Sequence, residues 1–418
     1  MSDASTPESA PAGQRAAVIF VFFVVVLDVL AMGVTIPSWP LLIKGFLGGD
    51  TPHAVAIGGY LATGWAVAQF LCTPIQGSLS DRFGRRPVLL MSMVGLGLDY
   101  VLMALAPNLW WLAVGRLISG ATAASFSTAN AYIADITPPE KRPAAFGMMG
   151  AAFGAGFVFG PALGGYLADF DPRLPFWVAA GLALLNAAYG YFILPESLPV
   201  ERRMAFSFRR ANPIGSLNLL ASNRKIAGLG LANFFYAVGH NVYPAIFAWF
   251  AYYRYGWNGK MMGGALAAVG VMSILVNGFL AGPVVKALGT RRSILAGLGF
   301  GIAGFLLYAV GPTQEWVIIA IPIAGLWGIY GPAAQTVMTQ SVDPHMQGQL
   351  QGALASLMGL ASIISPGLYT QIFARGIDPA SPIHLPGAPF YMAAFLLVCA
   401  FGCAWYATKL EPAPAAAE

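Results

Sequence analysis

Three charged residues, Asp28, Asp99 and Arg116, lie deep inside apolar segments, whereas every other Asp, Glu, Lys and Arg falls in a predicted loop, tail or helix end. A charge at the bilayer centre costs at least about 2.5 kcal/mol, so such residues normally face a cavity and serve a function. Burial favours a neutral carboxyl group and a nearby cation favours a charged one, so an arginine can decide whether an aspartate holds a proton. We expect Asp28 to carry a proton and Asp99 and Arg116 to tune it. The alternative is a buried Asp–Arg pair that only locks helices together.

His240 is a second titratable candidate within the apolar segments, because imidazole changes charge near neutral pH. Asn233, Tyr236, His240 and Tyr243 recur at helical spacing and would form a polar, aromatic cavity wall. A histidine that only packs and hydrogen-bonds remains the alternative. The residues that we expect to bind substrate are Gln69, Asn130, Asn233, Tyr236, His240, Asn241, Asn277 and Gln335. Some of these amides could instead bond helices to one another, as amides in membranes do.

A short loop motif predicts a conformational switch. It contains Gly77, Asp81, Arg82, Gly84, Arg85 and Arg86. Asp81 could cap a neighbouring helix N-terminus, or could pair with an arginine in one conformation only. A solvated basic turn would explain the arginines but neither Asp81 nor the glycines.

A second glycine-rich motif lies in the predicted fifth span, with Gly156, Gly160, Pro161 and Gly164 among its members. Small residues four apart let helices approach closely, and a proline bends the helix. We expect these residues to take part in gating, with ordinary close packing as the alternative.

The composition indicates that the segments carrying these residues are surrounded by lipid. Only 9% of the 418 residues are charged and 57% are hydrophobic, against about 25% charged in soluble domains. The basic residues lie in short turns, which argues against a nucleic-acid partner. Three cysteines without a CxxC pair predict no metal site, the nucleotide-binding loop pattern is absent, and we expect no cofactor.

Apolar segments of about 20 residues predict an all-α integral membrane protein with twelve spans. The first six lie near 16–36, 54–74, 87–106, 109–130, 144–168 and 175–194, and the others near 226–250, 261–283, 293–311, 316–338, 348–373 and 388–408. The loop motif and the glycine motif each recur 205 residues later; Gly84, for example, corresponds to Gly289. The chain therefore contains the same structural unit twice. We therefore expect two pseudo-symmetric six-helix halves, 1–194 and 226–418, joined by a cytoplasmic linker, 195–225.

The basic residues also predict the orientation. With both termini inside, sixteen Lys and Arg lie on the cytoplasmic side and five on the other, which is the bias that the positive-inside rule requires. No cleavable signal peptide is expected, since the first apolar run can span and carries an aspartate.

Together these elements resemble the major facilitator superfamily. The loop motif matches its loop signature, Arg116 with Gly120 its fourth-helix motif, and Gly156 to Gly165 its antiporter pattern. Within that superfamily the chain is most similar to the tetracycline-resistance type of drug:proton antiporter, through Leu27-Asp28 and Leu98-Asp99-Tyr100 among others. The resemblance implies a major facilitator fold and proton-coupled export of a small amphipathic drug by alternating access. We expect a monomer in the inner membrane whose partners are substrate, protons and the lipid bilayer.

Two positions depart from that group. Ser273 stands where well-known members carry a histidine in the eighth helix, and Gly301 where they carry an acid in the ninth. Both belong to the group's coupling and substrate machinery, so the sequence leaves open whether tetracycline itself is a substrate. Asn277 replaces a glutamine and keeps an amide.

Two other functions remain open on the sequence. A proton symporter that imports a sugar, carboxylate or vitamin-like anion could share the fold, and fold does not decide direction. A transport-inactive sensor or scaffold has less support because no soluble domain is attached. An enzyme is not expected, since no loop could hold a catalytic domain.

Overall fold

The computed structural model describes residues 12–123, 125–138, 141–206, 217, 219–220, 224–343 and 346–409, with side chains placed from residue 21 onward apart from 126, 143 and 144. Much of the predicted linker, including Arg209 and Arg210, therefore lies outside the described residues, as do both ends of the chain. Within the described ranges every regular element is helical and none is a strand. The prediction of an all-α membrane protein is confirmed.

We call the helices that precede the predicted linker the N-terminal half. They are α1 (Ala12–Thr35), α2 (Ser38–Phe46), α3 (Thr51–Phe83), α4 (Arg85–Leu105), α5 (Leu109–Thr122), α6 (Ser125–Ile136), α7 (Arg142–Ala168) and α8 (Leu174–Ile193). Side-chain caps fix where some of them begin. Asp50 accepts a hydrogen bond from the backbone N–H of His53 at the start of α3, and Asn108 does the same for Trp110 and Trp111 at the start of α5.

We call the helices that follow the predicted linker the C-terminal half. They are α9 (Arg224–His240), α10 (Val242–Tyr255), α11 (Gly259–Leu275), α12 (Ala281–Leu288), α13 (Thr290–Val310), α14 (Gln314–Gly325), α15 (Tyr330–Gln340), α16 (Gln347–Ile377) and α17 (Ala388–Ala407). A π-helical turn, Val276–Leu280, joins α11 to α12, and a 3-10 turn, Leu326–Ile329, joins α14 to α15. Asn258 caps α11 through the N–H of Met261.

These helices follow the order of the predicted spans, but several spans are interrupted. Among the described residues nine helical segments are long and apolar enough to cross a membrane, and α1 with α2, bent by 43°, makes a tenth. The fourth and seventh predicted spans fall on α5–α6 and α9–α10. The helices α5, α6, α9 and α10 have 14, 12, 17 and 14 residues, fewer than the roughly 20 that a typical span contains. Two successive helices therefore make up each of these spans.

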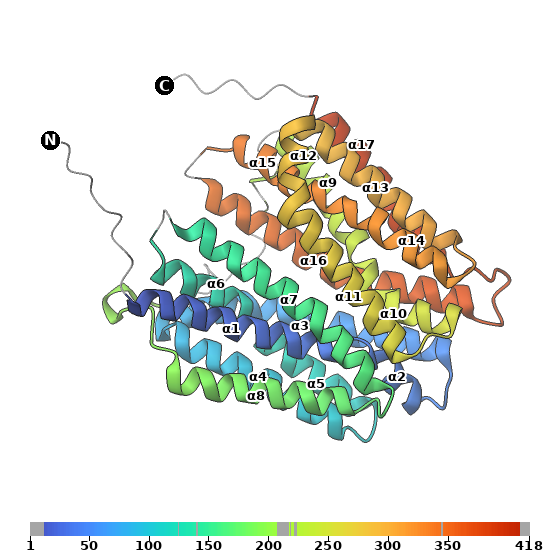
Figure 1. Cartoon of the computed structure of the whole chain (residues 1–418), viewed down its shortest axis with the longest axis horizontal. Helices are drawn as coiled ribbons and strands as arrows, with labels where there is room; N and C mark the ends of the chain where they lie inside the picture. Colours follow the sequence, from blue (N-terminus) through green and yellow to red (C-terminus); the bar gives the residue numbers. More distant parts are fainter. Residues whose placement is uncertain are drawn as a thin grey trace.

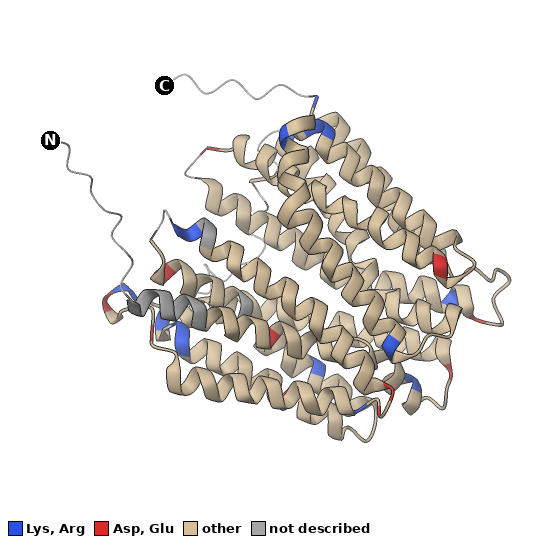
Figure 2. Cartoon of the chain, viewed as in Figure 1, with Lys and Arg blue, Asp and Glu red and all other residues tan. Residues whose placement is uncertain are grey.

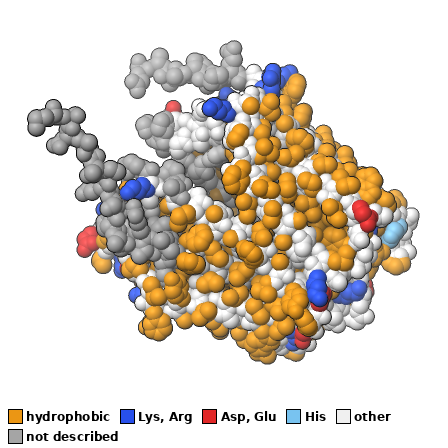
Figure 3. Space-filling view, in the orientation of Figure 1, with side chains coloured by type: hydrophobic (Ala, Val, Ile, Leu, Met, Phe, Trp, Pro, Cys, Tyr) orange, Lys and Arg blue, Asp and Glu red, His pale blue; other side chains and the backbone are white. Residues whose placement is uncertain are grey.

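The two halves lie side by side with their helices roughly parallel (Figure 1). Helix α7 packs along α11 and α3 along α16, and these pairs join the halves. Charged residues gather mostly at the two ends of the bundle (Figure 2), and hydrophobic side chains cover much of the visible face between them (Figure 3). We call the end that carries the loop from Gly77 to Arg86 the motif end, and the end where α2 meets α3 the opposite end.

Candidate functional site

Asp28 lies in α1 and makes its one described hydrogen bond to α6. The hydroxyl of Ser125 donates to Oδ2 of Asp28 at 2.6 Å. The other carboxylate oxygen, Oδ1, is buried and accepts no hydrogen bond from the described residues. The carboxyl group is therefore held on one side only, and its second oxygen is available for a proton.

Arg116 forms an ion pair with Asp99, not with Asp28. Its Nη2 lies 3.8 Å from Oδ2 of Asp99, whose side chain is fully buried. The guanidinium lies over the rings of Trp39 and Trp65, at 4.8 and 5.5 Å from their centroids, and donates to Ser119 at 3.2 Å. Aromatic faces stabilise a desolvated cation, so the two tryptophans support the Arg116 guanidinium within the span.

Tyr100 on α4 lies near both acidic groups. It is 3% exposed and lies within electrostatic reach of Asp28, Asp99 and Arg116. Of the three charged residues singled out from the sequence, Arg116 and Asp99 pair directly, and all three lie in the N-terminal half around Tyr100, on α1, α4 and α5. Sequence reasoning missed Ser125 and Trp65, because serine and tryptophan are ordinary in apolar spans, and it missed Trp39, because that residue lies between the first two predicted spans.

His240 belongs to a separate aromatic group in the C-terminal half. It ends α9, and its ring stacks on Trp327 at 4.7 Å between centroids and lies 6.2 Å from Tyr236. Tyr236 in turn stacks on Tyr330 at 4.2 Å, and the hydroxyl of Tyr330 donates to Asn233 at 3.1 Å. The His240 side chain is nevertheless exposed, so the predicted stripe presents an imidazole at the surface of an aromatic wall.

Interruptions in three spans of the C-terminal half surround this wall. The α9–α10 break carries Asn241, whose amide is 3.5 Å from the Ser362 hydroxyl. The π-helical turn carries Asn277, whose amide donates back to Ser273, and the 3-10 turn carries Trp327. Turns of this kind free backbone groups and often occur at functional sites.

The remaining predicted substrate residues lie on other helices. Gln335 is half-buried on α15, while Gln69 on α3 and Asn130 on α6 are half-buried in the N-terminal half. No contact described here joins these three side chains to His240, so their membership of a common site stays a prediction.

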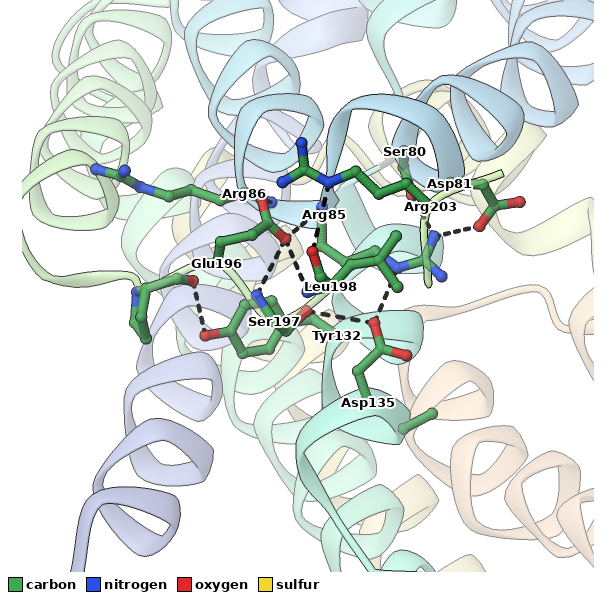
Figure 4. Close-up of polar contacts among 12 residues, drawn as sticks. Ser80, Asp81, Arg85, Arg86, Tyr132, Asp135, Glu196, Ser197, Leu198 and Arg203 are labelled. Carbon is green, nitrogen blue, oxygen red and sulfur yellow. Dashed lines mark hydrogen bonds and ion pairs between the residues drawn. The ribbon is translucent and has the colours of Figure 1, made fainter. Parts of the chain in front are cut away.

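The loop motif forms a polar network at the motif end (Figure 4). Arg85 lies at its centre: its guanidinium pairs with Asp81 at 2.6 Å and with Asp135 at 3.0 Å, and donates to Ser80 at 2.6 Å. Of the two roles considered for Asp81, the structure shows pairing with an arginine.

Glu196, which the sequence placed only in the linker, completes this network. Its carboxylate accepts hydrogen bonds from the backbone N–H of Arg85 at 2.8 Å and of Arg86 at 3.3 Å, at the N-terminus of α4. Gly84 allows this approach, because it has φ 109° and a Cβ there would lie 2.2 Å from Oε2 of Glu196. An anion at a helix N-terminus is stabilised by the unpaired N–H groups.

The other loop residues have lesser contacts. The Arg86 guanidinium lies over Tyr191 and donates to its carbonyl oxygen, and Arg82 lies over Phe83 at 5.1 Å. Gly77 has open space around it.

We predict that Asp81→Asn slows turnover about tenfold while equilibrium substrate binding changes much less. The change removes the Asp81 carboxylate from Arg85 but leaves the ion pair with Asp135, so the fold should persist. The Asp81–Arg85 contact, which would form in one conformation only, is weakened. Transport rate and binding affinity, measured on the same purified sample, check this. Glu201→Gln, an equal charge change at an exposed residue with no described ion pair, should leave the rate unaltered, and normal transport by Asp81→Asn would remove Asp81 from the mechanism.

The glycine motif of α7 packs against α1 directly beyond Asp28. A Cβ at Gly156, Gly160 or Gly164 would lie 2.0–2.8 Å from atoms of Val29, Gly33 or Val34. The neighbouring Gly165 faces the other way, and a Cβ there would lie 2.0 Å from the carbonyl oxygen of Gly259 in α11. Close packing therefore occurs both within the N-terminal half and between the halves.

Further contacts close the halves at the opposite end. Asp169, after α7, accepts hydrogen bonds from the N–H groups of Gly259 at 2.7 Å and Lys260 at 3.2 Å, which begin α11. The hydroxyl of Tyr252 donates to the carbonyl oxygen of Pro37 at 2.8 Å. The described ion pairs of the motif end, by contrast, all lie within the N-terminal half. In this conformation the two halves therefore contact each other at the opposite end.

Comparisons with known proteins agree with this architecture. Residues 21–366 match the sequence profile described as Major Facilitator Superfamily. The class C tetracycline resistance protein of Escherichia coli is 39% identical over 90% of this chain and 94% of its own length, and the Escherichia coli class B protein is 32% identical over 90% and 94%.

Solved structures agree as well. The human organic anion transporter MFSD10 has a TM-score of 0.70 at 24% identity, covering 94% of this chain and 100% of its own. A D-xylose-proton symporter has a TM-score of 0.72 at 18% identity, covering 93% and 96%. These likenesses concern the fold alone, whereas the profile and the sequence relatives extend over most of the chain. This multi-pass membrane protein therefore belongs to the Major Facilitator Superfamily of transporters and is not an enzyme.

Proposed function

We propose that this protein exports a small amphipathic organic molecule, of tetracycline-like character, in exchange for protons by alternating access. The observation that carries the proposal is the Asp28 carboxyl group, held on one side by Ser125 with its other oxygen buried and unpaired. A carboxylate is costly at that depth, so cycling through a neutral, protonated form accounts for its presence.

The substrate would bind between the halves, near the aromatic wall. His240, Tyr236 and Trp327 offer flat apolar faces, and Asn233, Asn241, Asn277 and Gln335 offer amides. Gln69 and Asn130 would contribute from the N-terminal half. Few polar groups on a mostly apolar wall suit an amphipathic ligand.

The motif end would face the cytoplasm, and both termini with it, because the positive-inside bias requires this orientation. The chain would then act as a monomer in the inner membrane, open toward the cytoplasm in this conformation. The relatives named tetracycline resistance proteins support export rather than uptake.

Purified protein in proteoliposomes tests the proposal directly. A thermal-shift panel that compares tetracyclines with other lipophilic drugs and organic anions would first select binders. Proton movement driven by a selected compound, with the opposite pH gradient driving the compound, is the expected result. If a broad panel drives no proton movement, transport itself is refuted and a scaffold role is favoured.

We predict that the unmodified protein gives cells little protection against tetracycline itself, because Ser273 and Gly301 replace a histidine and an acid. Ser273→His should be tolerated, since Ser273 is exposed. Gly301→Asp should destabilise the protein, because a Cβ there would lie 2.7 Å from Leu397 and 3.2 Å from Trp327, and overpacking costs about 1–3 kcal/mol. Growth in graded tetracycline and thermal unfolding check these outcomes, and high-level resistance from the unmodified chain would show that other residues fill both roles.

A further inference from the structure

A groove lies between α11 and α14 in the C-terminal half, beginning at the opposite end where both helices start. Its volume is about 700 Å³, within the range of about 300–1,000 Å³ that small-molecule sites have. Along α11 it extends from Met261 to Met272, a length of about 16 Å at 1.5 Å per residue. The groove is therefore large enough for a small organic molecule.

The walls of the groove are mostly apolar. They include Met261, Ala268 and Val271 on α11, and Ile318 and Pro322 on α14. Met261, Val271 and Ile318 are 42%, 45% and 67% exposed, and the glycine face of α11 that packs against α7 is turned the other way. The groove therefore opens to the lipid, and its occupant must be soluble there.

The indole of Trp257 brings a hydrogen-bond donor without a partner to the outer end of the groove. Trp257 lines the groove just before α11 begins, and its Nε1 has no acceptor among the described residues. The ring packs against Phe247 and Tyr255 and is 9% exposed. A buried indole N–H usually has a partner, and an unpaired one destabilises the protein. An occupant that accepts a hydrogen bond here would supply the missing partner.

An acceptor without its helical donor lies deeper in the same groove. Pro322 falls inside α14 and has no N–H, so the carbonyl oxygen of Ile318 loses the donor four residues further on. Ile318 is one helical turn past Gln314, where α14 begins, or about 6 Å deeper. An unpaired carbonyl group is costly in lipid. A phospholipid acyl chain has no donor at this depth, whereas a molecule with a hydroxyl or amine group has one.

Met272 closes the inner end of the groove. A Cβ at Gly325, the last residue of α14, would lie 3.1 Å from Cβ of Met272, so the two helices touch there. The next residue of α11, Ser273, accepts from Asn277 of the π-helical turn, and Gly325 directly precedes the 3-10 turn that carries Trp327. The groove thus ends next to the aromatic wall, and Met272 separates the two in this conformation.

We propose that this groove is a second binding site, reached from the lipid, for a small amphipathic molecule with one hydrogen-bond acceptor and one donor. The acceptor lies against the Trp257 indole at the membrane interface, and the donor meets the Ile318 carbonyl oxygen about one turn deeper. The apolar body of the molecule lies between α11 and α14. This site is distinct from the proposed transport site and does not depend on proton coupling.

Photolabelling of the purified full-length chain in phosphatidylcholine nanodiscs tests the proposal. The probe, 4-hydroxybenzophenone, has a ketone oxygen that accepts a hydrogen bond and a phenol hydroxyl that donates one, and near-ultraviolet light attaches its ketone carbon to adjacent C–H groups. The comparison probe, 4-methoxybenzophenone, has a similar shape without the donor. We expect saturable labelling of residues 261–272 and 314–322, with half-maximal labelling at about threefold lower concentration of the hydroxy probe, the effect of one hydrogen bond.

Variants assign the labelling to the groove. Trp257→Phe keeps an aromatic ring but removes the donor, and should weaken the binding of both probes about threefold. Pro322→Ala restores a helical N–H for the Ile318 carbonyl group, so the preference for the hydroxy probe should disappear. Ala268→Phe fills the groove and should abolish labelling, whereas Ala188→Phe, the same change at an exposed position of α8, should leave it unaltered. Thermal unfolding of each variant verifies that the fold is intact.

Two results would overturn the proposal. Equal labelling by the two probes, or labelling of α8 as strong as that of the groove, would mean that the probes only partition into lipid. Labelling of the groove in neutral detergent but not in phosphatidylcholine nanodiscs would mean that a lipid acyl chain fills the groove.

Discussion

Asp28→Asn is expected to abolish transport driven by a pH gradient while substrate still binds. An asparagine mimics the neutral acid permanently and is of similar size, and its nitrogen or oxygen can still meet Ser125. Without a group that alternates between charged and neutral forms, the chain can exchange substrate across the membrane but cannot couple this to protons. Accumulation driven by a pH gradient should therefore fall at least about 100-fold, which is the scale on which positioned proton-transfer groups act.

Two further variants give this experiment its controls. Asp28→Glu keeps a titratable carboxyl group and should retain gradient-driven transport, although at a lower rate. Ser125→Ala removes only the hydrogen bond and should shift the pH profile without erasing it. Accumulation against a gradient by Asp28→Asn would show that Asp28 is not the carrier, and Asp99 or His240 would then be tested in the same way.

Gly165→Ala is expected to open the opposite end of the transporter. The added methyl group would lie 2.0 Å from the Gly259 carbonyl oxygen, so α7 and α11 cannot approach as closely as they do here. In a conformation where the halves separate at this end the methyl group costs nothing. A penalty of about 1–3 kcal/mol on one state shifts the ratio of the two states roughly 5- to 150-fold.

Pulsed electron paramagnetic resonance would detect this shift. Spin labels at Asp171 and Lys260, which are exposed on opposite halves, should report a longer distance in Gly165→Ala, and transport should slow. Gly164→Ala is the matched control, because its methyl group would meet Val34 of the same half; it should lower thermal stability and leave the distance unchanged. An unaltered distance in Gly165→Ala would exclude closure by this contact.

The sequence predicted the spans well because an apolar run of sufficient length has few alternatives in a membrane. It did not predict the breaks at Pro37, Asn241 and Trp327, since local composition there resembles that of a continuous span. Asp28, Asp99 and Arg116 could be found because charges are rare at that depth. Their partners Ser125, Trp39 and Trp65 could not, because the first and last are of kinds common in spans, Trp39 lies between two predicted spans, and packing decides which helices meet.

In the loop network, too, some residues could be predicted from the sequence and their partners could not. Asp81 and the arginines form a compact sequence motif, whereas Glu196 and Asp135 come from distant segments and carry no pattern of their own. In the same way, Arg116 pairs with Asp99 and not with Asp28, and the sequence could not tell these two partners apart because packing decides which helices face one another.

The first residues of the predicted linker contact the N-terminal half, and these contacts decide where the chain can be split into two polypeptides. Glu196 binds the start of α4, Ser197 donates to Asp135, and the N–H of Met204 donates to the carbonyl oxygen of Asp81. A cut directly after α8 would strip the first fragment of these contacts, whereas a cut after Phe206 would keep them. Two polypeptides co-expressed with the later breakpoint should therefore reassemble into a working carrier far more efficiently than two with the earlier one.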